Sequence, residues 1–233
     1  LYPYQENAGF SEGTITNVSL PASQNATVNS FDPKANISVG ATSSSNLVLM
    51  NVCSLLKIVV EPGESYSKAV ITSNDGTAMC GTLNISFDVE GNPVVGGEIT
   101  NGSSSVTLMG NMGSTTDPTN YYVVVLPKTY TKGFTVRLYK DGQEGAAAMK
   151  YISSSVQIAR SQIGNFGHIE AGLLLPGVFT VNSEGKKVQF ARGNLWCDET
   201  TSPKTYDFEN NQYEIVLGEA TPNATSHRTH FFK

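Results

Sequence analysis

The sequence is short of charged residues: Asp, Glu, Lys and Arg make up 15% of its 233 residues, against roughly 25% in an average soluble protein. The net charge is −5, and no stretch is rich in lysine and arginine. A polyanion such as nucleic acid needs a basic surface that neutralises its phosphates. The composition therefore argues against such a partner. Serine, threonine, asparagine and glycine take the place of the missing charges.

Cysteines and long apolar runs are also scarce. Three cysteines are too few for a disulfide framework. We expect Cys53 and Cys80 to be buried as small apolar side chains, and the sequence leaves a bridge between them open. Cys197, beside Trp196, is either free or buried.

No apolar run reaches the roughly 18 residues of a membrane span. Because the chain starts at Leu1 without a signal-like leader, we expect a mature protein or a fragment from which any signal segment or lipid-anchor cysteine has been removed.

Motifs that would carry catalysis are missing. The sequence contains no nucleophile elbow, phosphate loop, dinucleotide fingerprint or paired-cysteine zinc spacing. NVCSLLKIVV (51–60) holds a Ser-x-x-Lys spacing, Ser54 to Lys57, but in a strand an odd offset places the two side chains on opposite faces. We interpret the stretch as a turn and a core strand, and Ser65 to Lys68 in the same way. We therefore expect no enzyme, with carboxylates that converge only in three dimensions as the one open alternative.

Histidines give weak metal signals. His227 and His230 have a His-x-x-His spacing, with Cys197 as a conceivable third zinc ligand. They have no carboxylate partner close in sequence and no helix-forming context, so we expect no metal and no cofactor. His168 is isolated, which is typical of a structural or solvated histidine. The acidic turn DGQEG (141–145) lacks the ligand pattern of a calcium loop and predicts a hairpin turn.

Alternating apolar and polar residues predict strands almost throughout. The apolar run YYVVVL (121–126) predicts a strand covered on both faces. Turn residues occur at Asn74-Asp75-Gly76, Glu90–Pro93 and Asp141-Gly142. Only residues 158–168 hint at a short helical turn. We predict an all-β fold, a Greek-key β-sandwich of about seven strands across most of residues 30–170. The predicted strands are 13–20, 55–60, 65–73, 82–90, 105–110, 121–127 and 133–140.

A second unit is predicted after a boundary near residues 171–179, where Pro176-Gly177 interrupts the pattern. Beyond it, VFTV (178–181), a Ser-Glu-Gly turn and KKVQF (186–190) predict a hairpin. We expect residues 173–233 to form part of a small β-rich module.

Several short motifs, in order along the chain, resemble the fimbrillin-like surface proteins of Bacteroides and its relatives. They are LYPYQ (1–5), SLPASQNA (19–26), NSFDPKANISVG (29–40), LVLMNVCSLLKIVV (47–60), ITSNDG (71–76) with CGTLNISF (80–87), YYVVVLPKTYTKGFTVRLY (121–139) and IARSQI (158–163). From LPGVFTVNSEGKKVQFARGNL (175–195) onward, the chain is similar to a C-terminal module of secreted Bacteroidetes proteins.

The resemblance implies a pair of transthyretin-like sandwiches, exported to the cell surface and outer membrane as a lipoprotein. Residues 1–30 would be the end of a preceding sandwich or a linker, residues 31–172 the fimbrillin-like sandwich, and residues 173–233 the partial C-terminal module. Membrane attachment would depend only on the removed lipid anchor.

The leading hypothesis is a non-enzymatic adhesin or fimbrial subunit that assembles by strand exchange with other copies or related subunits. The candidate exchange residues are Val178, Phe179, Val181, Val188 and Phe190. The alternative is a glycan-binding lipoprotein for nutrient capture, with host or bacterial glycans or proteins as partners. Its candidate rings are Tyr2, Tyr4, Tyr66, Tyr121, Tyr122, Tyr130, Tyr139, Tyr151 and Trp196. Exposed rings gathered at one end of the fold would favour that alternative.

Overall fold

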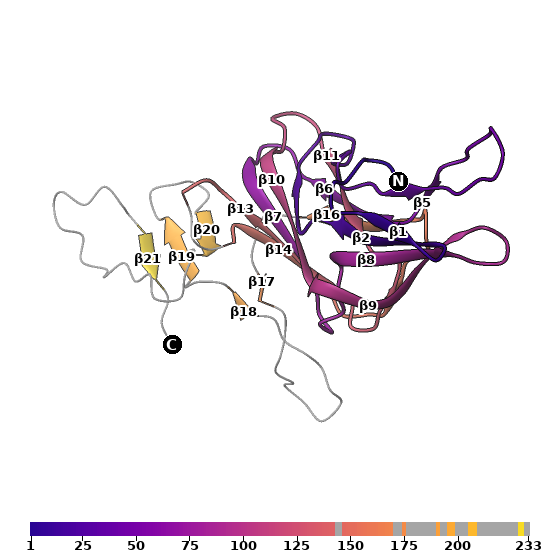
Figure 1. The fold of residues 1–233 in the computed structure, drawn as a ribbon. Coiled ribbons are helices and arrows are strands. Elements are labelled where there is room, and N and C mark those ends of the chain that lie inside the picture. Colours follow the sequence, from indigo (N-terminus) through magenta and orange to yellow (C-terminus); the bar gives the residue numbers. More distant parts are fainter. Residues whose placement is uncertain are drawn as a thin grey trace, which may run out of the picture. The chain divides into compact units, whose positions relative to one another are not determined.

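The computed structural model describes residues 1–142 and 146–169, and five short strands beyond them (Figure 1). The chain divides into two compact units, Leu1–Ala171 and Gly172–Lys233. This division lies one residue from the predicted boundary at 172/173. The predicted division at residue 30 has no counterpart, because residues 1–30 belong to the first unit.

The first unit is an all-β structure of the β-sandwich class, as predicted. One antiparallel sheet has the order β1 (Gly9–Ser11), β2 (Thr14–Leu20), β8 (Cys80–Phe87) and β9 (Pro93–Ser103). A five-stranded sheet has the order β14 (Ala148–Ile152), β13 (Phe134–Tyr139), β7 (Tyr66–Ser73), β10 (Ser105–Met112) and β3 (Ser23–Asn25). A third sheet contains β11 (Thr119–Val125), β6 (Ser54–Val60) and β16 (Ile163–Ile169). Two small ribbons pair β4 (Ser38–Val39) with β5 (Met50–Asn51) and β12 (Thr129–Tyr130) with β15 (Val156–Gln157).

One apolar core joins the three sheets. In residues 69–73 of β7, 105–108 of β10 and 136–139 of β13, buried side chains alternate with partly exposed ones. This period of two is what one covered sheet face requires. Strand β11 instead buries Val123, Val124 and Val125 in succession, which confirms that its two faces are covered.

The predicted helical turn at residues 158–168 is wrong. Residues 163–169 form strand β16, which runs parallel to β6 with Ile163 opposite Leu55 and Ile169 opposite Val60. The register shifts between Asn165 and His168, and Gly167 adopts a positive φ at this irregularity. Pairing with a strand about a hundred residues away therefore outweighs the local pattern.

Two of the predicted turns join paired strands, whereas a third does not. Gly91 and Gly142 have positive φ in the connections of β8 to β9 and of β13 to β14, which are antiparallel hairpins. The turn at 74–76 instead carries the chain from β7 in the five-stranded sheet to β8 in the four-stranded sheet. It is a crossing between sheets and not a hairpin.

Residues 1–30 are an integral part of the first sandwich. Strand β2 pairs with β8, with Val18 opposite Leu83, and Val18 and Leu20 are buried in the core. Strand β3 runs parallel to β10 at the edge of the five-stranded sheet.

The sequence pattern does not predict strands β9 and β14, because glycines and polar residues interrupt the alternation in PVVGGEITNGS and AMKYI.

The open edge of β11 is closed by a side chain. The Gln24 amide donates to the carbonyl oxygen of Val124 at 2.8 Å and accepts from its N–H at 2.9 Å. Gln24 is 1% exposed. The N–H of Tyr122 donates to the carbonyl of Ser30, and the N–H of Leu126 to the carbonyl of Met79. A primary amide thus replaces one peptide group of a missing neighbouring strand.

Replacing Gln24 with leucine should lower the free energy of unfolding by about 2–5 kcal/mol, because it leaves the buried N–H and C=O of Val124 unpaired. Urea denaturation of the full chain measures this change. The control is Gln157→Leu, because Gln157 is exposed on β15. Equal small effects of the two substitutions would contradict the role of the amide.

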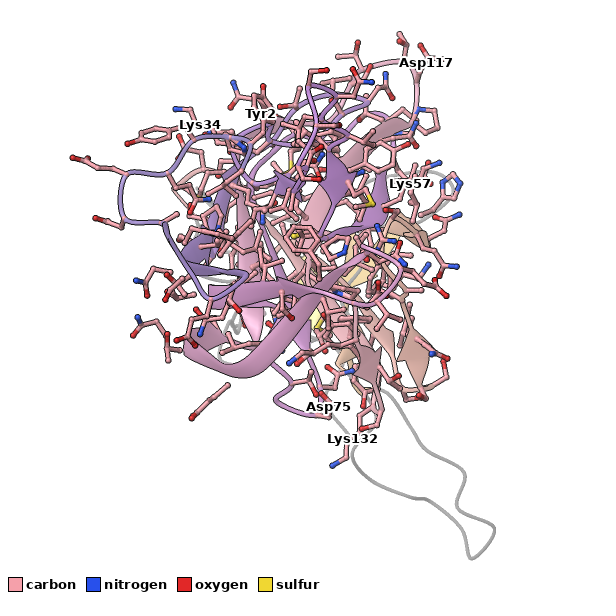
Figure 2. The ribbon with its side chains drawn as sticks, turned by 45° about the vertical axis from the view of Figure 1, so that its right-hand side comes forward. Tyr2, Lys34, Lys57, Asp75, Asp117 and Lys132 are labelled. Carbon is pink, nitrogen blue, oxygen red and sulfur yellow. The ribbon has the colours of Figure 1, made fainter. Side chains whose placement is uncertain are left out.

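The crossing at 74–76 is held by Asp75, which lies at the end of the first unit opposite Tyr2 (Figure 2). Its carboxylate accepts hydrogen bonds from the N–H of Thr77 and from the N–H and hydroxyl of Thr131. The hydrogen bond from the Thr77 N–H is the main cause that holds the pKa of Asp75 well below its ordinary value. These bonds join the crossing to the segment before β13.

Because the folded-state pKa of Asp75 is lowered, its stabilising contribution is present above the ordinary aspartate pKa of about 3.9 and is lost as the pH falls below it. We therefore expect the stability difference between the native chain and Asp75→Asn to be larger at neutral pH than at pH near 3. Urea midpoints at both pH values measure it, with Asp117→Asn in an exposed loop as the control. A difference that does not change with pH would contradict this assignment.

Candidate functional site

The Ser-x-x-Lys spacing does not form a catalytic pair. The Ser54 hydroxyl is buried and donates to the carbonyl oxygen of Ala159 at 2.7 Å. Lys57 has the opposite parity on β6 and is partly exposed. At the second spacing, Lys68 lies with its Nζ 4.3 Å from the centroid of the Tyr139 ring. Both lysines therefore lack the serine partner that the motif would require.

The two cysteines of the first unit have packing roles. Cys53 and Cys80 are free thiols, and both are buried in the core. Burial raises the pKa of Cys53 to about 12 and also raises the pKa of Cys80. A thiol with so high a pKa is neutral at physiological pH and is a poor nucleophile. The bridge that the sequence left open is not formed.

No metal-like cluster of three His, Cys, Asp or Glu side chains occurs in the part of the chain that the structure describes. His168 pairs with Glu61 through its Nδ1 atom at the surface. In the second unit, β19 (Leu195–Asp198) lies between β20 (Thr205–Phe208) and β21 (Arg228–His230). The register places His230 opposite Trp196 and Thr229 opposite Cys197, and His227 lies outside the described residues.

An apolar groove of about 580 Å³ opens on the first unit. Its walls come from the N-terminal segment, from β1 and from the loop between β4 and β5, where Gly40–Thr42 and Leu47 contribute. Ile15 and Phe87 also line it. No aspartate or glutamate side chain lines the groove. It therefore offers apolar contacts and a few neutral polar groups, among them Gln5 and Thr42, and none of the paired carboxylates typical of glycoside hydrolysis.

Exposed rings gather around this groove. Tyr4 and Phe10 line it and are 84% and 70% exposed, and Tyr2 nearby in the sequence is 60% exposed. Leu47, Val48 and Leu49 are also exposed on the loop between β4 and β5. Large apolar side chains in such numbers at one place are typical of a binding surface. Of the other predicted rings, Tyr66, Tyr121 and Tyr130 are buried, Tyr122 and Tyr139 are partly buried, Tyr151 is exposed, and the side chain of Trp196 lies outside the described part.

The groove adjoins an edge strand. Among the strands that the structure describes, β1 is the outer strand of its sheet and pairs only with β2, with Phe10 opposite Ile15. Beyond the end of β1, the Gln5 amide donates to the carbonyl of Ser19 at 2.9 Å and accepts from its N–H. Unlike Gln24, Gln5 is partly exposed. Gln5 therefore covers backbone groups of β2 that lie beyond β1, and not the outer edge of β1 itself.

The predicted strand-exchange residues lie in the second unit. Val178, Phe179, Val181 and Val188 are outside the described residues. Phe190 belongs to β18 (Phe190–Ala191), where it pairs with Leu175 of β17 (Leu174–Leu175) in antiparallel register. The groove was not predicted. Its only sequence signal is the ring-containing segment LYPYQENAGF, whose exposure depends on how the 40–49 loop folds beside it.

Comparisons with known proteins add no assignment. The chain matches no protein-family model, and no curated protein matches it. The described residues contain no helix long and apolar enough to cross a membrane.

A thiol-specific reagent should test the burial of Cys53 and Cys80. In a Cys197→Ser variant, we expect negligible labelling of the native chain at pH near 8 and labelling of both thiols after unfolding in urea, because burial keeps them neutral and inaccessible. Mass spectrometry counts the labels. Rapid labelling of Cys53 in the native chain would contradict the packing role.

Proposed function

We propose that this protein is a non-enzymatic cell-surface adhesin or fimbrial subunit. The observation that carries the proposal is the apolar groove beside edge strand β1. An edge strand offers unpaired N–H and C=O groups, and an adjoining apolar groove accepts alternate side chains of an added strand. The sequence motifs that resemble fimbrillin-like proteins agree with this function. The proteins of that family have transthyretin-like sandwiches and are exported as lipoproteins.

Assembly by strand exchange is the mechanism that we propose for this groove. An extended segment of another copy or of a related subunit would lie along β1, with its apolar side chains between Phe10 and Leu47. The edge of β11 is a poor acceptor because Gln24 and its neighbours already occupy its backbone groups. The segments around Val178–Val181 and Val188–Phe190 stay our candidate donors.

Filling the groove tests this function. Thr42 lines the groove and is exposed, so Thr42→Trp should block an added strand without disturbing the core. We expect the native chain to form heat-labile ladders on a denaturing gel and Thr42→Trp to lose them. Thr116→Trp, in an exposed loop whose residues do not line the groove, is the control and should keep them.

Two outcomes would overturn strand exchange at this groove: a native chain that stays monomeric, or ladders that persist in Thr42→Trp. A variant that ends at residue 172 distinguishes the donor. Unchanged ladders in this variant would exclude the second unit as the source of the added strand.

Glycan binding for nutrient capture is the second candidate function, and the exposed rings favour it. Tyr4 and Phe10 line one groove and are accessible, and aromatic faces are suited to stacking on sugars. A glycan array with the native chain and Tyr4→Ala separates the two functions. Binding that requires Tyr4, with no self-association, would support the glycan-binding function in place of assembly.

A further inference from the structure

The outer face of the five-stranded sheet is a second surface, and it shares no residue with the groove. On its inner side, Ala69, Ile71, Val136, Leu138 and Leu108 are fully buried. The intervening side chains point away from this core because successive residues of a strand alternate. They are partly or fully accessible, and they include Lys68, Val70, Thr107, Arg137, Tyr139 and Tyr151.

The strands that form this face contribute cations and no acidic side chain. The five strands β3, β7, β10, β13 and β14 contain no aspartate or glutamate, although the whole chain has a net charge of −5. Lys68 lies opposite Tyr139, and Arg137 lies opposite Val70. The two residues are therefore diagonal neighbours on adjacent strands, a position in which Cα atoms lie about 7–8 Å apart. Neither forms an ion pair with a carboxylate of the described residues.

Rings and hydroxyl groups surround the two cations. Lys68 Nζ lies 4.3 Å from the centroid of the Tyr139 ring. Tyr151 pairs with Thr135 on the neighbouring strand. Thr72 and Ser105 share a hydrogen bond of 2.8 Å between their hydroxyls. The face thus combines positive charge, aromatic surface and neutral hydrogen-bond donors and acceptors on one sheet.

We propose that this face binds an acidic polysaccharide, a polymer with a carboxylate on its sugar units. Carboxylates pair with Arg137 and Lys68, sugar hydroxyls bond to the threonine and serine side chains, and the tyrosine rings contact the apolar faces of the sugars. Nucleic acid fits less well, because its dense phosphates require a larger number of cations than two. The net negative charge of the chain argued against a polyanion as partner. The aspartates and glutamates that cause this charge, however, lie outside the five strands of this sheet.

Polygalacturonate, a polymer of galacturonic acid, is the probe. We expect the full chain to bind it at low salt, with weakening as the salt concentration rises, because accessible charges are screened. The double variant Lys68→Gln/Arg137→Gln should weaken binding about tenfold, since both charge-assisted bonds are lost. Isothermal titration measures the affinities, and urea midpoints check that the variant is folded.

A matched control removes two cations elsewhere. Lys34 lies in an exposed segment, and Lys57 lies on β6 in another sheet, so Lys34→Gln/Lys57→Gln should retain the native affinity. Absent binding, equal losses in the two double variants, equal binding of neutral dextran or tighter binding of single-stranded DNA would each overturn the proposal. Thr42→Trp should bind polygalacturonate normally, which separates this site from the function of the groove.

Discussion

A buried outer strand must find partners for its backbone groups inside the protein, and in the first unit this constraint falls on β11. The hydrogen bonds between Gln24 and Val124 show the constraint most directly. Strand β11 is apolar on both faces, so its free edge would be a strong template for pairing with another chain. A buried primary amide closes that edge with the same donor and acceptor that a peptide group supplies.

The closed edge connects parts of the chain that are far apart in sequence. Gln24 follows β2, whereas Val124 belongs to a sheet formed by residues 54–60, 119–125 and 163–169. Residues 1–30 therefore complete the sandwich at two places, as β2 beside β8 and as β3 beside β10. With the β11 edge closed, the accessible edge that adjoins a groove is β1, whose three residues are exposed.

Low charge has a related consequence. Because few residues are charged, an entire five-stranded sheet is free of acids, and two cations on one face suffice to give that face a positive character. The net charge of the whole chain cannot reveal that acidic and basic residues lie on different surfaces. It counts Glu6 and Lys68 without regard to their positions in the fold. Hydroxyl groups on the same face add hydrogen bonding without the desolvation cost of further charges.

Local alternation determined the strands of the core. The patterns around β2, β6, β7, β8, β10, β11 and β13 predicted each of these strands, because one buried face imposes a period of two. They also predicted that Cys53 is a packing residue and that Ser54 and Lys57 point apart. Sequence alone did not find β16, β9 or the groove. The parallel pairing of Ile163 with Leu55, and the approach of the 40–49 loop to Tyr4 and Phe10, are long-range contacts. Such contacts depend on the packing of the whole sandwich, so only the tertiary structure decided them.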